Sequence, residues 1–175
     1  IGAFDREKGT MDILKALKIL RDTGKLSSGS LTLVGDGPER PQIDKFIRKN
    51  GLSDIVTMTG WVDDITPFMK AEKIYLAPSY SEGLGVSLLK AMGAGMAVTA
   101  SDIPPHQELV ENNRTGLLFQ AGDPYDLAEK IGNLLDSPEL VGQLSRSARK
   151  FASKFDASLT SERIYRLYCE VCQPR

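Results

Sequence analysis

Short apolar runs alternate with longer amphipathic runs along nearly all of this 175-residue chain. The apolar runs are the length of strands, and the runs between them carry apolar residues at helical spacing. The expected strands are residues 1–4 (the end of a strand), 30–34, 55–58, 74–78, 96–100 and 115–119. Strands joined by helices are typical of right-handed βαβ units, which build a parallel sheet with helices on both faces. The pattern predicts an α/β fold with a Rossmann-like parallel sheet of about six strands.

Capping residues suggest where several of the helices begin. The first helix is expected to begin at Thr10, with Thr10 as its N-cap, and Asp123 is expected to cap a helix that begins at Pro124. After the strand at residues 96–100, two prolines make a rigid turn, and a short helix is expected from Glu108. The last two helices are expected over residues 138–155 and 156–172.

Composition excludes several classes of protein. The chain has 22 Lys and Arg against 23 Asp and Glu, so no net charge points to nucleic acid as a partner. No apolar run approaches the roughly 20 residues that span a bilayer, and no signal-peptide pattern is present. We expect one domain over residues 1–175, located in the cytoplasm, with peripheral attachment at the inner membrane face as the second option. The opening residues 1–4 look like the end of a strand that lost its beginning, which predicts a piece of a longer protein.

The metal-binding and redox residue types are few. Cys169 and Cys172 lie three positions apart, and His106 is the only histidine. A structural zinc site needs four ligands, so two unrelated thiols in a reducing compartment are the favoured interpretation and no metal is expected. His106 has no visible acid or nucleophile as a partner, which predicts a surface-loop histidine.

Residues 74–95 read as a buried strand, a polar turn and a helix. The turn contains a lone acid, Glu82, followed by Gly83, Leu84 and Gly85. A glycine turn that leads into a helix leaves backbone N–H groups pointing outward, where the helix dipole favours an anion. Glu82 would then accept hydrogen bonds from nearby hydroxyl groups. An ordinary strand-to-helix connection explains the same residues equally well.

Two other turns follow strands in the same way. Lys8 lies between the first strand end and the first helix, and Gly35 and Gly37 follow the second strand. Taken singly, Lys8 reads as a solvated lysine and the Gly-x-Gly pair as a plain turn, because the third glycine of a dinucleotide motif is missing. However, the carboxyl ends of parallel strands share one sheet edge, so these turns should converge with Glu82. Trp61 follows a further strand and would either wall a pocket for a base or simply pack.

Together these segments resemble the C-terminal donor-binding domain of group 1 retaining glycosyltransferases, enzymes with two facing Rossmann-like domains (the GT-B architecture). The resemblance covers essentially the whole chain, and its specificity comes from the order of the motifs. The matching segments are residues 7–9, 34–38, 78–95, 101–103, 108–110, 115–119 and 122–124.

The resemblance implies a nucleotide-diphosphate sugar, a UDP- or GDP-sugar, as donor substrate, with no metal and no further cofactor. It implies that Lys8 contacts the diphosphate and that Glu82 binds hydroxyls of the donor sugar. Charge-assisted contacts of this kind are strong, and stabilising a leaving diphosphate is mainly electrostatic work. The other donor-contacting positions that it implies are Gly83, Leu84, Gly85, Val86, Gly35, Gly37, Trp61 and Val62.

Two positions depart from the family pattern. Lys90 stands where the family usually has a second acid that holds the ribose hydroxyls, and Ala3 stands where it usually has Arg, which Arg6 would have to replace. An ammonium donates hydrogen bonds but cannot accept from both hydroxyls as a carboxylate does. The alternative is therefore a degenerate, non-catalytic nucleotide-binding or interaction module of the same fold. A nucleotide-sugar epimerase is a third interpretation that no residue favours.

The acceptor site of this architecture belongs to the N-terminal domain, which this sequence does not contain. The acceptor, a glycan, lipid or small molecule, would therefore bind outside these residues. We expect the chain alone to bind a nucleotide weakly and to turn nothing over.

Overall fold

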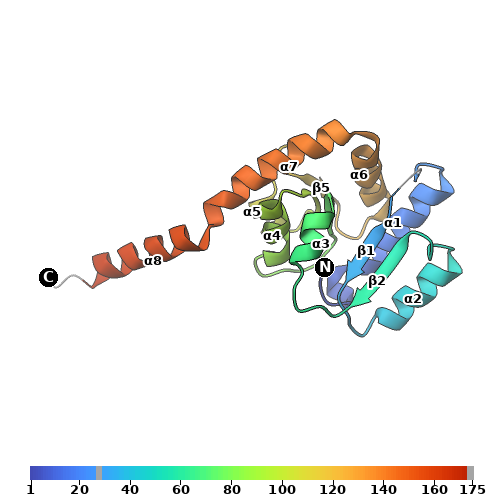
Figure 1. Ribbon diagram of the computed structural model, residues 1–175, viewed down its shortest axis with the longest axis horizontal. Coiled ribbons are helices and arrows are strands. Elements are labelled where there is room, and N and C mark those ends of the chain that lie inside the picture. Colours follow the sequence, from blue (N-terminus) through green and yellow to red (C-terminus); the bar gives the residue numbers. More distant parts are fainter. Residues whose placement is uncertain (27–28, 173–175) are drawn as a thin grey trace.

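The computed structural model describes residues 1–26 and 29–172 as five strands with helices between them (Figure 1). The strands are β1 (Leu31–Val34), β2 (Val56–Gly60), β3 (Ile74–Ala77), β4 (Ala97–Ser101) and β5 (Leu117–Phe119). The α-helices are α1 (Thr10–Asp22), α2 (Arg40–Lys49), α3 (Thr66–Ala71), α4 (Val86–Ala94), α5 (Pro104–Leu109), α6 (Pro124–Asp136), α7 (Pro138–Ala152) and α8 (Ala157–Val171). Two short 3₁₀ helices are η1 (Arg6–Lys8) and η2 (Ser153–Phe155). The predicted α/β class is confirmed.

All named strands pair in parallel, but they form two separate groups. β1 pairs with β2, and β3, β4 and β5 pair in that order. Each parallel connection runs through at least one helix, as the alternation of the sequence predicts. The five strand bounds lie within three residues of the expected runs, with β2 extending to Gly60.

The expected sixth strand, at residues 1–4, is not a strand in the structure. Gly2 donates its amide to Val34 O at 2.9 Å and Phe4 donates to Asp36 O at 2.9 Å, so the segment runs beside the end of β1. On its other side, Ile1 O accepts a hydrogen bond from the Tyr75 hydroxyl of β3, at 3.5 Å. A strand needs a continued ladder, and this segment has two ladder bonds on one side alone.

Two main apolar clusters hold the halves of the fold. The first joins β1 and β2 to α1, α2 and α6 and includes Leu14, Ile43 and Leu127, all fully buried. The second joins β3 and β4 to α4 and α7 and includes Leu88 and Val98. The helical stripes of the sequence therefore face these cores, as amphipathic helices do on a sheet.

Helix starts agree with the sequence at most positions. The helix α1 begins at Thr10 as expected, but its N-cap is Gly9 and the Thr10 side chain does not cap it. The Asp123 side chain accepts from the amides of Tyr125 and Asp126, which confirms it as the N-cap of α6. The expectation for α5 was wrong, because that helix begins at Pro104 rather than at Glu108. Proline has a φ suited to the first helical turn and needs no hydrogen-bond acceptor there, so a helix can begin at it.

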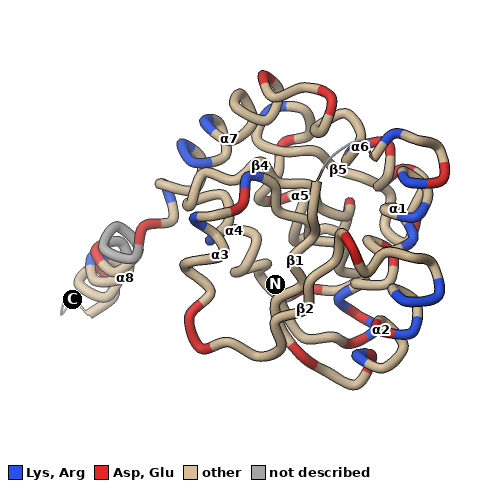
Figure 2. The backbone as a smooth tube through the Cα atoms, turned by 45° about the vertical axis from the view of Figure 1, so that its right-hand side comes forward, with Lys and Arg blue, Asp and Glu red and all other residues tan. Residues whose placement is uncertain are grey.

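The last helix, α8, extends away from the body of the molecule toward the C-terminus (Figure 1). Basic and acidic residues are interspersed over the rest of the fold (Figure 2). Within the described residues, no helix is both long and apolar enough to cross a membrane.

Candidate functional site

A cavity of about 210 Å³ opens at the carboxyl ends of β1 and β3. Lys8, Ser79, Glu82, Gly85 and His106 are among the residues that line it. The first comes from η1, and the others come from the connection after β3 and from α5. The cavity therefore draws on both strand groups, which is where a parallel α/β fold places a ligand.

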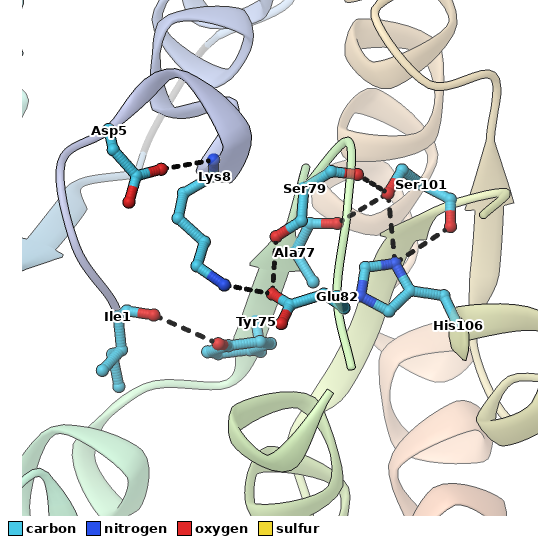
Figure 3. Close-up of polar contacts among 9 residues, drawn as sticks. All are labelled: Ile1, Asp5, Lys8, Tyr75, Ala77, Ser79, Glu82, Ser101 and His106. Carbon is cyan, nitrogen blue, oxygen red and sulfur yellow. Dashed lines mark hydrogen bonds and ion pairs between the residues drawn. The ribbon is translucent and has the colours of Figure 1, made fainter. Parts of the chain in front are cut away.

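Lys8 and Glu82 meet directly in this cavity although 74 positions separate them (Figure 3). Lys8 Nζ lies 2.8 Å from Glu82 Oε1, and the Ser79 hydroxyl donates to the same oxygen at 2.8 Å. The Lys8 backbone is fixed in turn, because its amide donates to the Asp5 carboxylate at 3.0 Å. The predicted convergence of the Lys8 turn with the Glu82 turn is thus present in the structure.

The surroundings of Glu82 keep it ionised. Partial burial alone would raise the pKa of its carboxyl group, but the hydrogen bonds from Lys8 and Ser79 and the Lys8 charge outweigh that effect. The pKa of Glu82 is lowered as a result. At neutral pH the site therefore presents one carboxylate and one ammonium, each a partner for the other.

The loops that carry Lys8 and Glu82 are locked together by their backbones. Tyr80 donates its amide to Glu7 O at 2.7 Å. Gly9 has φ +62°, and a Cβ placed there would lie 2.1 Å from Pro78 O. A larger residue at position 9 would clash with a carbonyl group, so glycine is needed for this contact.

A second contact ties the same loop to α1. The Tyr80 hydroxyl donates to the buried Asp12 carboxylate. This bond, together with partial burial and the negative charge of Asp12, raises the pKa of Tyr80 to about 12. Sequence reasoning missed the pair, because the two residues are 68 positions apart and neither has a motif.

The helix α4 begins at the cavity with an open N-terminus. Its N-cap is Gly85, at φ +67°, and no side chain caps the helix. The first amides of a helix lack intrahelical partners, and here Val86 and Ser87 line the cavity. Leu84 and Val86 beside this helix start are 55% and 53% exposed.

His106 is a correction to the sequence analysis. It is not on a surface loop but 1% exposed on α5, beside Glu82 and Gly85. Its Nδ1 lies 3.1 Å from both the Ser101 carbonyl and the Ser101 hydroxyl, and that hydroxyl donates to Ser79 O. Burial lowers the pKa of His106. The signal available in the sequence was its position, five residues after the end of a buried strand whose carboxyl end faces the site.

The glycine pair after β1 lies elsewhere. A Cβ at Gly35 would be 1.8 Å from Gly2 O, and one at Gly37 would be 2.5 Å from Phe4 O. Both glycines therefore let the backbone of residues 1–4 pass close to the end of β1. Neither lines the 210 Å³ cavity.

The positions expected around a nucleoside are also outside this cavity. Trp61 is 78% exposed, with its indole N–H 3.3 Å from an Asp63 carboxylate oxygen, and Val62 is half-buried. Lys90 lines a different cavity, of about 520 Å³, together with Lys70 and Arg149. Of the expected contacts, the structure gathers in the first cavity Lys8, Glu82, Leu84, Gly85 and Val86, with Gly83 in the same turn.

Comparison with known proteins shows the family. Residues 1–151 match the family model described as glycosyl transferases group 1. The chain is 28% identical over 174 residues to alpha-D-kanosaminyltransferase of Streptomyces kanamyceticus, covering 98% of this chain and 45% of that protein. It is 30% identical to an N-acetylgalactosaminyltransferase of Campylobacter jejuni that acts on N,N'-diacetylbacillosaminyl-diphospho-undecaprenol, with 94% and 42% covered. The chain therefore spans less than half the length of these relatives.

Solved structures agree on the fold. Sucrose-phosphate synthase of Thermosynechococcus elongatus superposes with a TM-score of 0.83 at 28% identity, over 98% of this chain and 44% of that one. Anabaena HepE in complex with UDP gives 0.89 at 24% identity, over 97% and 47%. The C-terminal domain of a group 1 glycosyltransferase from Francisella tularensis gives 0.79 at 19% identity, over 88% and 82%. The chain belongs to the group 1 glycosyltransferase family and has the fold of the C-terminal half of a GT-B enzyme.

Proposed function

We propose that residues 1–175 are the donor-binding domain of a retaining glycosyltransferase that transfers a hexosyl group from a UDP- or GDP-sugar to an acceptor. The observation that carries the proposal is the meeting of Lys8, Glu82 and the open N-terminus of α4 in one cavity. A cation, a carboxylate and free amides within one small space match the phosphate and hydroxyl groups of a nucleotide sugar.

Each group has a distinct role in this proposal. Lys8 neutralises charge on the diphosphate, and the amides at the start of α4 add hydrogen bonds to the phosphate oxygens. Glu82 accepts hydrogen bonds from hydroxyls of the donor sugar, which its depressed pKa permits near neutral pH. Ser79 stays with Glu82 and holds the carboxylate in place.

The same groups favour departure of the diphosphate. Negative charge grows on the leaving group as the bond to the sugar breaks, and Lys8 and the α4 amides would stabilise that charge. These groups supply the positive potential from the protein itself, so no metal and no further cofactor are part of the proposal. Lys8 and Glu82 satisfy one another across 2.8 Å, and in this proposal donor binding exchanges that contact for one contact from each residue to the donor.

The nucleoside is expected to extend from the cavity toward Trp61 and Val62. Anabaena HepE and the pneumococcal O-GlcNAc transferase, both similar in fold, have been solved with UDP. By the resemblance in the sequence, the two residues would line the base, and Gly35 and Gly37 would support the other side of the site. Trp61 is free to stack because most of its side chain is exposed.

The acceptor would be held by an N-terminal domain that faces this cavity. We therefore expect no sugar transfer from residues 1–175 alone. We also propose that the protein is located in the cytoplasm, with peripheral attachment at the inner membrane face as the second option. Measurable transfer from a nucleotide sugar to any acceptor by the purified chain would contradict the expected inactivity.

Calorimetry and ligand-observed NMR with UDP, GDP and ADP test the donor site. Binding of UDP or GDP at up to millimolar concentration is expected, weakened at least tenfold in Lys8→Met. The matched control is Lys15→Met, since Lys15 pairs with Asp12 on α1 and is not among the residues lining the cavity. Absence of binding to all three nucleotides, or equal weakening by both variants, would count against the site.

The second candidate is a non-catalytic nucleotide-binding or interaction module of the same fold. Lys90 favours it, because this residue occupies the position of the family's second acid and opens on a separate cavity with Lys70 and Arg149. The two candidates can be distinguished in a protein that contains both the N-terminal domain and residues 1–175. A donor-binding domain supports sugar transfer there, whereas a non-catalytic module binds the nucleotide without hydrolysing or transferring the sugar.

A further inference from the structure

The buried ring of His106 has one nitrogen fixed by the protein and one left over. Its Nδ1 lies 3.1 Å from both the carbonyl oxygen and the hydroxyl oxygen of Ser101. Its Nε2 has no hydrogen-bond partner among the described residues. Figure 3 shows the ring with Nδ1 facing Ser101 and the other nitrogen on the side of Glu82. The unused nitrogen is thus the one nearer the proposed donor site.

The neighbours of Ser101 determine which ring nitrogen carries the proton. The Ser101 hydroxyl has a single hydrogen, and besides His106 its neighbours are the carbonyl oxygens of Ser79 and Ala77, which can only accept it. Toward Nδ1, the hydroxyl oxygen and the carbonyl oxygen of Ser101 are therefore both acceptors. Nδ1 must donate, so in the neutral ring Nδ1 holds the proton and Nε2 has a lone pair.

The environment keeps this ring neutral at physiological pH. Burial lowers the pKa of His106, and the charge of Lys8 acts in the same direction. The Ser101 carbonyl and the charge of Glu82 raise the pKa without overcoming the effect of burial. At neutral pH Nε2 is therefore a hydrogen-bond acceptor and not a second donor.

Nε2 opens onto the 210 Å³ cavity. His106 is only 1% exposed, and it lines this cavity together with Glu82 and Gly85. Among the described residues, the Thr99 hydroxyl is the one side-chain polar group shut away from solvent without a hydrogen bond. Nε2 also lacks a hydrogen bond, so the small exposed part of the ring includes this nitrogen. A Cβ at Gly85 would lie 3.8 Å from Nε2, which places the nitrogen beside the start of α4.

An acceptor at this position distinguishes between the parts of a nucleotide sugar. Phosphate oxygens are themselves acceptors, so a neutral imidazole with Nε2 unprotonated does not bind them. A sugar hydroxyl has a hydrogen to donate. In this cavity Lys8 and the α4 amides suit the diphosphate, whereas Glu82 and Nε2 of His106 suit hydroxyl groups.

We propose that His106 is a donor-binding residue whose Nε2 accepts a hydrogen bond from a hydroxyl of the donor sugar, beside the hydroxyl bound by Glu82. Two neighbouring acceptors select a sugar that has hydroxyls at both positions over one that is deoxygenated at either. The role given to His106 rests on the proposed function and deepens it.

Nitrogen NMR tests this role directly, because His106 is the only histidine of the chain. In ¹⁵N-labelled protein without a histidine tag, the imidazole gives one pair of nitrogen signals. At pH 7.5 we expect a protonated Nδ1 and an unprotonated Nε2. UDP-glucose or GDP-mannose should move the Nε2 signal upfield, as hydrogen bonding to an unprotonated nitrogen does. UDP and GDP, which lack the sugar, should move it much less.

Two amide variants separate contact with the sugar from support of the fold. His106→Asn can keep a donor near Ser101 but leaves the Nε2 position empty, whereas His106→Gln can place an amide oxygen there. We expect His106→Asn to weaken binding of the sugar nucleotide roughly three- to tenfold more than binding of the nucleoside diphosphate, the scale of one hydrogen bond. His106→Gln should restore part of that difference. Calorimetry with both ligands is the measurement.

A purely structural role predicts a different result. Both ligands would then lose affinity equally, and His106→Gln would be the worse variant because its amide lies farther from Ser101. Equal losses, a protonated Nε2 in the free chain, or equal shifts with UDP and UDP-glucose would each overturn the proposal. If a variant fails to fold, the spectra of the parent chain decide.

Failure of the donor site itself is distinguishable from these outcomes. If the parent chain binds none of UDP, GDP, UDP-glucose and GDP-mannose, the proposed function and the role of His106 are overturned together. Binding of a sugar nucleotide without the Nε2 shift overturns the role of His106 alone.

Discussion

The two glycine pairs of this chain have similar sequences and different surroundings. Gly35 and Gly37 follow β1, and Gly83 and Gly85 follow β3 before α4. The backbone of residues 1–4 packs against the first pair. A Cβ at Gly35 would lie 1.8 Å from Gly2 O, and one at Gly37 would lie 2.5 Å from Phe4 O. A Cβ added at Gly83 would meet no atom within 4 Å, and one at Gly85 would meet only side chains, at ordinary contact distances. A Gly-x-Gly turn at a strand end can therefore serve chain packing or ligand access, and the neighbouring backbone decides which.

The largest expected effect is a difference in the free energy of unfolding between alanine substitutions in the two glycine pairs. Gly35→Ala would drive a methyl group into Gly2 O at a φ of +138°, and we expect a loss of about 3 kcal/mol in the free energy of unfolding. Gly83→Ala has open space and should stay within about 0.5 kcal/mol of the parent. Urea unfolding of the two variants measures the difference. Equal stability in both would mean that the close approach at Gly35 relaxes without cost.

The next prediction concerns the open pair and its acid. Glu82→Gln keeps the size of the side chain but removes the charge that faces Lys8 and the donor hydroxyls. We expect affinity for a UDP- or GDP-sugar to fall roughly 10- to 100-fold, the scale of one or two lost charge-assisted hydrogen bonds. Affinity for the free nucleoside diphosphate, which lacks the sugar, should fall less. Calorimetry with the sugar nucleotide and the diphosphate side by side checks this, and an equal loss for both ligands would refute the role given to Glu82.

A third, smaller effect should appear as a pH dependence of stability. Burial holds the pKa of His106 below its ordinary value of 6.5. Between the two values the unfolded chain binds more protons than the folded one, so stability is complete above about pH 6.5 and is lost as the pH falls toward the folded pKa. Thermal melts from pH 7.5 to 5 should show this decline.

The substitution His106→Gln removes the titrating group and should flatten that part of the pH profile, whatever its effect on the Tm at pH 7.5. The carboxyl group of Glu82 also has a lowered pKa, but its contribution is lost in a more acidic range, below its ordinary value of 4.5. An unchanged slope between pH 6.5 and 5 in the variant would show that other groups cause the decline.

The smallest expected effect is at Lys90, in the second cavity. Lys90→Glu would place a carboxylate where the family usually has one, and we expect a gain of a few-fold in UDP or GDP affinity. Lys70→Glu in the same cavity is the matched control for a general change of charge. A fall in affinity with Lys90→Glu alone would show that the lysine contacts the nucleotide as it stands.

Sequence reasoning reached the fold because the periodicity of the side chains reports burial directly. Alternating apolar runs identified all five strands, and the shared edge of parallel strand ends predicted that Lys8 and Glu82 lie close together. The prediction of a sixth strand was wrong because residues 1–4 have the composition of a strand end but make only two ladder bonds, both to the end of β1. His106 failed because burial of a polar ring depends on partners such as Ser101, whose position no local pattern encodes.

The two glycine pairs also show what local sequence cannot predict. Gly35 and Gly37 could not be separated from Gly83 and Gly85 by composition, since what differs is a distant backbone segment. The family resemblance assigns roles to Trp61 and Lys90 as well, but neither residue lines the first cavity, and Lys90 lines the second one with residues of α3. Apart from the convergence of Lys8 and Glu82, contacts between residues far apart in sequence could not be predicted without the structure.

The contact between Gly9 and Pro78 limits how this site can change during evolution. A Cβ at position 9 would lie 2.1 Å from Pro78 O. Any residue other than glycine there would therefore push the Lys8 loop and the Glu82 loop apart. Lys8 and Glu82 project from these fixed loops as partly exposed side chains, so they can be exchanged without moving the backbone. New donor preferences would therefore arise by replacing side chains on an unchanging frame, while lengthening or rebuilding either loop would require both to change at once.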